Sequence, residues 1–354
     1  LDSIALENDP LKGLIKIDII NAQRGFSDPN TSNTNDTPKG TGSLSSQFRS
    51  YYDSHLNPSD TPDLSDIDAL DAIYTAQTTF DNKLKTSFLP ALTELEKLGY
   101  PGFGNPKITL SSKVNPIDGL NHASAVQFDV MSDSSSLLRL PEKYNGLGYQ
   151  NLISMIFQLI RFRNEWMKTG KQGKSNSDHI EPLHLILIEE PEAHLHAQVQ
   201  QVFINKAYDI LRNHSNLKEE KQFSTQLVVS THSSHIAHEV DFINLRYFQR
   251  KQPIQKTDIP TATVVNLSKT FGGKDSTTKF AIRYLKTTHC DLFFADAVIL
   301  VEGSAERMLI PHFIRYHFPE LTTSYISLLE IGGSHADKLR PLIENLGLIT
   351  LIIT

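Results

Sequence analysis

The segment Leu185-Ile186-Leu187-Ile188-Glu189-Glu190-Pro191 carries the most information about the architecture of this chain. Its unbroken apolar run is typical of a strand that is covered on both faces, as in a parallel sheet. Ligands of such sheets bind beyond the carboxyl ends of the strands, where Glu189 and Glu190 would lie. One acid there can hold Mg²⁺, and a second can orient or deprotonate an attacking water. The alternative without a functional role is a solvated acidic turn after the strand.

Two further segments could contribute to a phosphate site. A strand-like run ends in Ser230-Thr231-His232-Ser233, and a His in this position can reach a phosphate oxygen with a ring N–H. The alternative is a His that caps the next helix or is merely exposed. The segment Asn145-Gly146-Leu147-Gly148-Tyr149-Gln150 opens a predicted helix, and helix N-termini bind anions through free N–H groups. Here the alternative is a plain turn.

The C-terminal part of the chain alternates strands and helices in the order βαβαβ. This order predicts a parallel sheet with right-handed crossovers, with elements at 297–301, 304–316, 325–331, 338–346 and 348–353. The first strand ends in Glu302, and Gly303 is expected to permit a tight turn that exposes the Glu302 carboxylate. Glu306 follows on the first helical turn, and paired carboxylates suit Mg²⁺ or Mn²⁺. The alternative for Glu306 is a helix-start acid favoured by the dipole.

The rest of the chain supports an α/β fold class. Alternating apolar and polar residues predict short strands at 14–20, 107–111 and 124–130, and helical periodicity predicts helices at 69–98 and 150–167. The second half adds a helix at 193–212, strands at 226–230, 243–249 and 262–266, and helices at 234–239 and from 272–273 to about 288. The segment 27–68 is rich in Ser, Asn, Asp, Thr and Pro, so it is expected to be a mobile loop.

Composition excludes several classes of protein. The 354 residues contain 34 Lys and Arg and 40 Asp and Glu, and the net charge of −6 excludes a globally basic nucleic-acid coat. A single cysteine, Cys290, excludes a disulfide scaffold and a multi-Cys zinc site. No apolar run approaches the roughly 18 residues of a membrane span. We therefore expect a cytoplasmic protein without a membrane partner.

The ordered set of motifs resembles a known group of ATPases. The apolar strand with its two acids, the stretch Glu192–His196 and the strand that ends in Thr-His-Ser resemble ABC-type ATPases, in the branch that includes structural-maintenance and overcoming-lysogenization-defect (OLD) proteins. The resemblance implies that Glu189 is the Walker B acid, that Glu190 is the catalytic base and that His232 is the switch histidine. It makes Glu192–His196 the D-loop.

The same resemblance gives the glycine-containing helix start a role. It implies that Gly146, Gly148 and Gln150 belong to the signature motif, which contacts the nucleotide held by the opposite subunit. The usual Ser-Gly-Gly core of that motif is replaced here by Leu147-Gly148-Tyr149.

The stretch from Val298 to Glu306 resembles the start of a Toprim domain, the metal-dependent fold of topoisomerases, primases and OLD-family nucleases. The resemblance implies that Glu302 is a metal ligand or general acid/base in phosphodiester cleavage and that Glu306 is the second acid. It predicts an ABC/OLD-type ATPase domain at 1–290 and the N-terminal part of a Toprim domain at 291–354.

Two motifs of the family are missing from the sequence. No Gly-x-x-x-x-Gly-Lys-Ser/Thr phosphate loop occurs, because Gly173-Lys174-Ser175 and Gly272-Gly273-Lys274 both lack the required spacing and context. In the family this loop lies near the N-terminus, and the chain begins with Leu1 rather than Met. We expect the loop to precede Leu1 and the Asp-x-Asp acids of the third Toprim strand to follow Thr354.

The order of the motifs therefore indicates an OLD-family ATP-dependent DNA endonuclease, a group that includes Gabija-type nuclease subunits. The resemblance implies ATP and Mg²⁺ or Mn²⁺ as cofactors, DNA as substrate, a homodimer or higher homo-oligomer, and a helicase-type partner subunit. ATPase head dimerisation would gate the Toprim site, in antiphage defence or DNA repair. Two alternatives stay open: a non-nuclease ABC-type ATPase or repair scaffold, and an inactive fragment that acts only by dimerisation.

Overall fold

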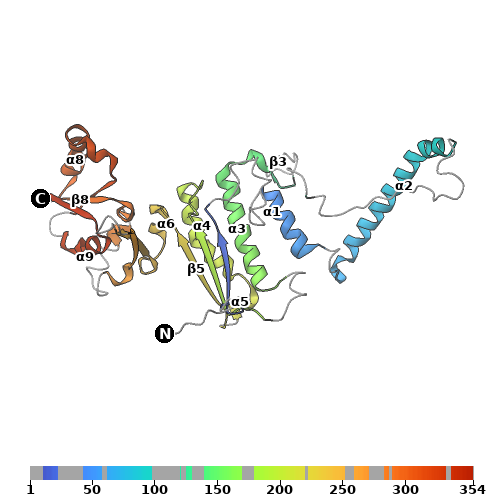
Figure 1. The fold of residues 1–354 in the computed structure, drawn as a ribbon, viewed down its shortest axis with the longest axis horizontal. Helices are drawn as coiled ribbons and strands as arrows, with labels where there is room; N and C mark the ends of the chain where they lie inside the picture. Colours follow the sequence, from blue (N-terminus) through green and yellow to red (C-terminus); the bar gives the residue numbers. More distant parts are fainter. Residues whose placement is uncertain are drawn as a thin grey trace. The chain divides into compact units, whose positions relative to one another are not determined.

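The computed structural model describes residues 11–22, 43–57, 62–97, 120, 125–129, 139–169, 179–219, 222–251, 259–270, 283–286, 289–331 and 336–353. The chain divides into two compact units, one made of 1–187 and 210–227 and the other of 188–209 and 228–354. Both units contain helices and strands (Figure 1), so the predicted α/β class is confirmed.

The first unit contains the N-terminal elements of the fold. Its strands are β1 (Ile15–Ile20), β2 (Gln127–Asp129), β3 (Arg139–Pro141) and the first parts of β4 (Leu183–Glu189) and β5 (Ser224–Ser230). Its helices are α1 (Leu44–Tyr51), α2 (Ile67–Lys97), α3 (Leu147–Trp166), α5 (Ser215–Glu219) and the end of α4 (Ala197–Arg212).

Strand β4 is the central strand in a sheet of order β1-β4-β5. At the start of the two strands, Ser224 N–H donates to Pro182 C=O over 2.8 Å, and at their ends Glu190 N–H donates to Ser230 C=O over 2.9 Å. The start of β5 is bonded to the start of β4, and the end of β5 is bonded to the end of β4. The two strands therefore run parallel, as the sequence predicts. The acid pair therefore leaves the carboxyl edge of a parallel sheet.

A buried polar pair joins β1 to β4 within this unit. His184 Nε2 lies 2.8 Å from Asp18 Oδ2, and Lys16 Nζ lies 3.3 Å from the other oxygen of the same carboxylate. The His184 side chain is fully buried and its ring packs 4.6 Å from that of Trp166. The contact gives the buried Asp18 carboxylate and His184 Nε2 a polar partner, which is the usual condition for burying such groups.

The prediction of a mobile loop over 27–68 is wrong for the part that begins at Ser43. The Ser43 side chain caps α1 by accepting from Ser46 N–H, and Leu44 is completely buried. Gln47 exchanges hydrogen bonds of 2.9 and 3.0 Å with Ser154 of α3. A polar sequence forms a buried helix here because tertiary partners satisfy its side chains, which composition cannot reveal. A π-helical turn (Tyr52–Leu56) continues α1; residues 27–42 lie outside the described part.

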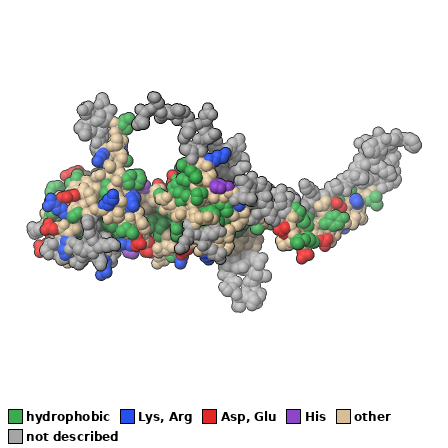
Figure 2. Space-filling model, turned by 90° about the horizontal axis from the view of Figure 1, so that it is seen from below, with side chains coloured by type: hydrophobic (Ala, Val, Ile, Leu, Met, Phe, Trp, Pro, Cys, Tyr) green, Lys and Arg blue, Asp and Glu red, His purple; other side chains and the backbone are tan. Residues whose placement is uncertain are grey.

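Helix α2 confirms the helix predicted at 69–98, and it begins two residues earlier, at Ile67. Many of its described side chains are exposed, including Tyr74 and Phe80. Figure 2 shows hydrophobic, acidic and basic side chains mixed along it, at the right of the view. The strand predicted at 107–111 lies outside the described residues, and the one at 124–130 is the short β2. Across the described residues, no helix has both the length and the apolar character needed to cross a membrane.

The second unit contains the predicted βαβαβ order. Its elements are β8 (Ala297–Val301), α8 (Ser304–His317), β9 (Ile326–Glu330), α9 (Ala336–Leu346) and β10 (Ile349–Ile353). The strands form a sheet of order β10-β8-β9, and both pairs are parallel, with Val301 opposite Glu330 on one side and Ile353 on the other. Strand β8 is therefore the middle strand, and its apolar side chains are buried.

One 3₁₀ turn, Pro319–Thr323, lies between α8 and β9. The elements that precede the sheet in the chain are α6 (Ser234–Glu239), the antiparallel hairpin of β6 (Arg246–Lys251) and β7 (Thr261–Asn266), and 3₁₀ turns at Phe242–Asn244, Leu267–Lys269 and Cys290–Phe294. One hydrophobic cluster joins them to β8, β9 and α9; its buried members include Ala237, Phe242, Cys290, Val298 and Leu342. Most of the helix predicted after 272–273 lies outside the described residues, and 283–286 are helical.

Candidate functional site at two strand ends

The acid turn after β4 has an unusual backbone. Glu189 is the last residue of β4, and Glu190 adopts a φ of 43°, in the left-handed region. A non-glycine residue pays about 1–3 kcal/mol for such a conformation, and residues of this kind cluster at functional sites. The hydrogen bond from Glu190 N–H to Ser230 C=O fixes the turn against the neighbouring strand. The side chain of Glu190 is 46% exposed, so a ligand can reach it.

The structure brings His232 to the same place. The Nε2 atom of His232 lies 3.7 Å from Glu190 Oε1, and the His232 side chain is 82% exposed. The two residues are far apart in the sequence, and the parallel pairing of β4 and β5 places both at one sheet edge. Their exposed side chains can face a phosphate group and its attacking water together.

Glu192 holds the backbone of the histidine loop, a role that sequence reasoning missed. Its carboxylate accepts from His232 N–H over 2.6 Å and from Thr231 Oγ1 over 2.9 Å. Thr231 Oγ1 in turn accepts from Ser233 N–H over 2.9 Å. The sequence places Glu192 only in a D-loop stretch, and its contact with Thr231 joins segments that are 39 residues apart.

Ser233 then ties the loop to helices α4 and α6. Its Oγ donates to Gln200 Oε1 over 2.6 Å and accepts from His235 N–H and Ile236 N–H, which makes it the N-cap of α6. The Gln200 amide donates to Leu195 C=O over 2.9 Å. The short helix therefore begins directly at the histidine loop and is fixed there by side-chain bonds.

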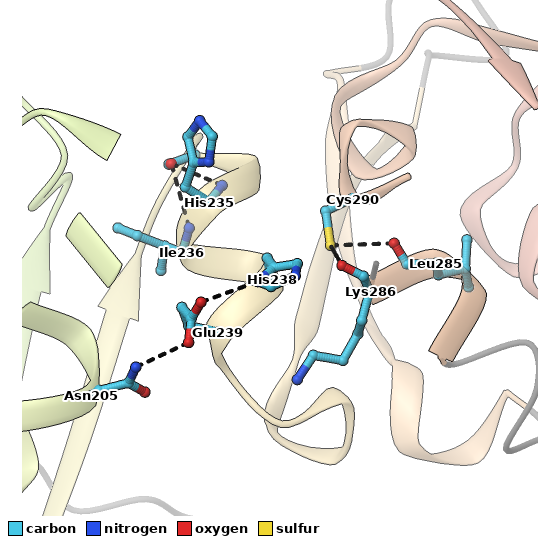
Figure 3. Close-up of polar contacts among 9 residues, drawn as sticks. Asn205, His235, Ile236, His238, Glu239, Leu285, Lys286 and Cys290 are labelled. Carbon is cyan, nitrogen blue, oxygen red and sulfur yellow. Dashed lines mark hydrogen bonds and ion pairs between the residues drawn. The ribbon is translucent and has the colours of Figure 1, made fainter. Parts of the chain in front are cut away.

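The end of α6 is fixed as well (Figure 3). Glu239 accepts from Asn205 of α4 over 3.0 Å and lies 3.1 Å from His238 Nδ1. The Asn205 hydrogen bond, followed by that of His238, holds the pKa of Glu239 below its ordinary value. Beside α6, Cys290 lies close to the Leu285 and Lys286 carbonyl oxygens, and burial raises the pKa of its thiol to about 11.

The glycine-containing helix start lies in the first unit. Gly146 is the N-cap of α3, and nothing lies within 4 Å of the place where a Cβ would stand. The Gln150 amide donates to Glu142 C=O over 2.7 Å and to Asn145 C=O over 2.9 Å. Gly148 lies on the first turn of α3. Glu189 and Glu190 belong to the second unit. A nucleotide that contacts both these acids and the helix start at Gly146 therefore stays a prediction.

The second strand end follows β8 and exposes Glu302. No hydrogen bond or ion pair connects the Glu302 carboxylate to another of the described residues, whereas Glu306 Oε2 accepts from Gly303 N–H over 3.1 Å. The contact of Glu306 is therefore that of an acid at a helix start, which is the alternative that the sequence offered for this residue. The reason given for Gly303 is wrong, because its φ of −150° is extended backbone that any residue can adopt.

A third acid, Glu330, ends the neighbouring strand at the same edge. Its register partner is Val301, the residue before Glu302, and Arg307 Nη1 lies 3.9 Å from Glu330 Oε2. Sequence reasoning read the stretch around Glu330 only as a strand and turn; the signal is an acid at the end of a second parallel strand. Tyr284 Oη donates to the Glu330 carbonyl, and burial is the main cause that raises the pKa of Tyr284.

The donor atoms at this edge are of the type that a hard divalent cation prefers, but the described residues supply fewer of them than such a cation needs. Carboxylate oxygens are what Mg²⁺ and Mn²⁺ prefer, and the Glu302 carboxylate has no hydrogen bond or ion pair to another described residue that would compete with a cation. In the part of the chain that the structure describes, no three His, Cys, Asp or Glu side chains gather to hold a metal ion. The two Gly-Lys sequences rejected as phosphate loops lie outside the described residues.

Comparisons with known proteins match the part of the chain around each of the two strand ends. A family model described as an AAA ATPase domain matches residues 4–237, and one described as the TOPRIM domain of overcoming lysogenization defect protein-like proteins matches residues 293–354. A curated relative, Endonuclease GajA of Bacillus cereus (strain HuB5-5), is 32% identical over 231 residues, which cover 61% of this chain and 31% of the relative. The chain spans about a third of the length of that relative. Because the ATPase model matches more than half of its residues, the chain belongs to the AAA ATPase domain family, with an OLD-like TOPRIM segment at its C-terminal end.

Proposed function

We propose that this chain forms part of an ATP-regulated, divalent-metal-dependent DNA endonuclease of the OLD type. The observation that carries the proposal is that one compact unit contains both strand ends: the Glu190–His232 edge and the edge with Glu302. The match to an endonuclease relative supports the reaction class. The boundary between the ATPase and Toprim parts belongs near residues 290 and 291, consistent with a TOPRIM match that starts at 293.

At the first edge, ATP hydrolysis needs a nucleotide-bound cation, an oriented water and a group that contacts the transferred phosphate. We assign these roles to Glu189, Glu190 and His232, in that order. The exposed Glu190 carboxylate accepts a proton from water, and the His232 ring, whose Nε2 lies 3.7 Å from Glu190 Oε1, donates to the phosphate. The helix start of a second copy, with Gly146, Gly148 and Gln150, contacts the same nucleotide, and Gln150 supports that turn through its amide hydrogen bonds to Glu142 and Asn145. This arrangement requires at least a homodimer.

At the second edge, Glu302 is the metal ligand or general acid/base for phosphodiester cleavage, and Glu306 is the second acid. A bound Mg²⁺ or Mn²⁺ would polarise the phosphate and lower the pKa of a bound water. To bind the cation directly, Glu306 Oε2 would release Gly303 N–H, or the cation would use the other carboxylate oxygen. ATPase head dimerisation would regulate access of DNA to this edge.

The setting of this activity is part of the same proposal. DNA is the substrate, the cytoplasm is the compartment, and antiphage defence or DNA repair is the process. A helicase-type subunit is a further partner that the resemblance to Gabija-type nucleases suggests.

The decisive experiment is the Glu302→Ala variant of the full-length protein, assayed by nicking of supercoiled plasmid with Mg²⁺ or Mn²⁺. We expect nicking to be abolished and ATP hydrolysis to be retained, because Glu302 lies on a different sheet from Glu190. Glu320→Ala, an exposed acid in the 3₁₀ turn Pro319–Thr323, is the matched control. Undiminished nicking by Glu302→Ala would contradict the nuclease assignment and favour a non-nuclease ATPase scaffold. Absence of both activities in the unmodified protein would favour an inactive fragment that acts only by dimerisation.

A further inference from the structure

The β6–β7 hairpin lies in the stretch between the two matched family segments, and its two faces differ. Its inner face packs Tyr247 and Val265 against the hydrophobic cluster of the second unit, and Gln249 Nε2 donates to Leu346 C=O over 3.1 Å. Burial raises the pKa of Tyr247, in agreement with its inward position. The hairpin is therefore attached to the body of the unit by one face only.

The outer face alternates cationic and aromatic side chains. Arg246, Phe248 and Arg250 lie on it, because they alternate with the inward Tyr247 and Gln249 along β6. The cross-strand partners of Phe248 and Arg250 are Val264 and Ala262, which are smaller and also exposed. Phe248 is 71% exposed and lies between two arginines on β6. The side chains opposite it on β7 are small and uncharged.

The hairpin is cationic, although the whole chain is acidic. The described residues 246–251 and 259–270 include Arg246, Arg250, Lys251 and Lys269 and no Asp or Glu. Arg246 Nη1 donates to two nearby backbone carbonyl oxygens, which holds its guanidinium in place. No ion pair joins Arg250 or Lys251 to another of the residues that the structure describes.

Protection of a sheet edge does not explain this face. Lys and Arg on exposed strands deter edge-to-edge pairing, but Phe248 on the same face would favour association. A partner that takes both cations and an aromatic ring explains all three side chains. Nucleic acid does so, because Arg binds phosphate and an aromatic ring stacks on a base.

We propose that the outer face of the β6–β7 hairpin binds DNA. Arg246 and Arg250 are four residues apart, about 13 Å along a strand at roughly 3.3 Å per residue. Measured along the duplex axis, that span corresponds to about four base-pair steps, at roughly 3.4 Å of axial rise per phosphate of one strand. A two-stranded ribbon also fits the major groove. Phe248 contacts a base or sugar between the two phosphate contacts.

The hairpin and the Toprim edge share one core. Tyr247 and Val265 pack against the cluster that contains Val298 and Leu300 of β8, the strand that leads to Glu302. DNA held by the hairpin is therefore held by the unit that carries the proposed cleavage site. This inference rests on the proposed function for its substrate, and it adds a surface that none of the assigned site residues provides.

The test is DNA binding by the full-length protein in EDTA, where cleavage cannot occur, with a labelled 30-base-pair duplex and a 30-nucleotide single strand. The Arg246→Gln, Arg250→Gln double variant, which removes both proposed phosphate contacts, is titrated at several salt concentrations between about 50 and 200 mM. We expect weaker binding and a slope of log affinity against log salt that is smaller by about 1.8, since each lost phosphate contact removes about 0.9. Phe248→Ala is expected to weaken single-strand binding about fivefold or more, because base stacking on an aromatic ring is lost.

The matched control is Lys83→Gln, Lys85→Gln on the exposed surface of α2, which makes the same change in net charge. It should leave affinity and salt slope unchanged, and thermal denaturation checks that all variants are folded. Wild-type affinity and slope in the hairpin variant would overturn the inference and leave the proposed function intact. Absence of DNA binding by the wild type would overturn both. Binding of phosphatidylserine vesicles through these residues, without DNA binding, would assign the face to a membrane and also overturn the inference.

Discussion

The two strand ends of the second unit are built differently. After β4, Glu190 has a left-handed φ and a bonded N–H, and Glu192 holds the backbone of the facing histidine loop. After β8, Glu302 extends from the edge without a protein contact among the described residues, and Glu306 caps the following helix. The first edge is fixed by side-chain and backbone bonds before any ligand arrives. At the second edge, no hydrogen bond or ion pair within the described part of the chain holds the Glu302 carboxylate.

Under the proposed function, the same location, the carboxyl end of a parallel strand, serves two kinds of chemistry. A water-activating site gains from groups that are held in place in advance, because reorganisation at the moment of reaction is avoided. A cation site gains from carboxylates that can still adjust to the coordination geometry of the ion. Substitutions at the first edge should therefore change the rate of hydrolysis, and substitutions at the second should change the dependence on metal.

Glu190→Gln should show the largest effect. It removes the group that accepts the proton from water while preserving the size of the side chain. We expect the kcat of ATP hydrolysis to fall about 100-fold or more, with an unchanged KM for ATP, in a steady-state assay of the full-length protein. The same change at the exposed Glu320 should have no effect. Unchanged turnover by Glu190→Gln would remove Glu190 from the catalytic role.

Glu192→Gln tests whether the fixed histidine loop matters for chemistry. The Glu192 carboxylate accepts from His232 N–H with one oxygen and from Thr231 Oγ1 with the other. An amide keeps one acceptor oxygen and no negative charge, so at least one of these two accepted bonds is lost. We expect kcat for ATP hydrolysis to fall about tenfold, with little change in KM, because misplacement of a positioned group mainly costs rate.

Thr231→Val, which removes one of those bonds from the other side, should lower kcat similarly, and the double variant should be less than additive. A lower melting temperature with wild-type kcat would show that Glu192 only stabilises the fold.

Glu306→Gln separates the two readings of Glu306. The amide oxygen can still accept from Gly303 N–H, so the free energy of unfolding should change by less than about 0.5 kcal/mol. If Glu306 also contacts the cation, plasmid nicking should fall about fivefold at limiting Mn²⁺ and recover at higher concentration. Wild-type metal dependence in this variant would leave Glu306 as a helix cap only.

Asn205→Ala should give the smallest effect, on stability. The hydrogen bond from Asn205 lowers the pKa of Glu239, so its contribution is present above the ordinary pKa of a glutamate and is lost as pH falls through the lowered value. We expect the variant to lose about 0.5 kcal/mol in denaturant unfolding at pH 7 and less at pH 3. An equal loss at both pH values would show that Asn205 acts by packing and not through the Glu239 carboxylate.

Much of the fold could be predicted because its signals are local. The apolar run before Glu189 and the strand–helix alternation after Ala297 each follow from neighbouring residues, and both are confirmed. Helix α1 could not be predicted, because Gln47 and Ser45 look like loop residues until Ser154 and Glu142 supply their hydrogen bonds. The roles of Glu189, Glu190, His232 and Glu302 stay predictions.

The sequence by itself determined which carboxylates end apolar strands and in what order the ATPase and Toprim motifs follow each other, because these are properties of residues next to one another. Only the tertiary structure decided that Glu192 bonds to His232 N–H, that Glu330 joins the Glu302 edge, and that a cationic face with Phe248 stands on the same core. These features depend on strand pairing and on which face of a strand is covered. Pairing and coverage are set by contacts between segments that lie far apart in the chain.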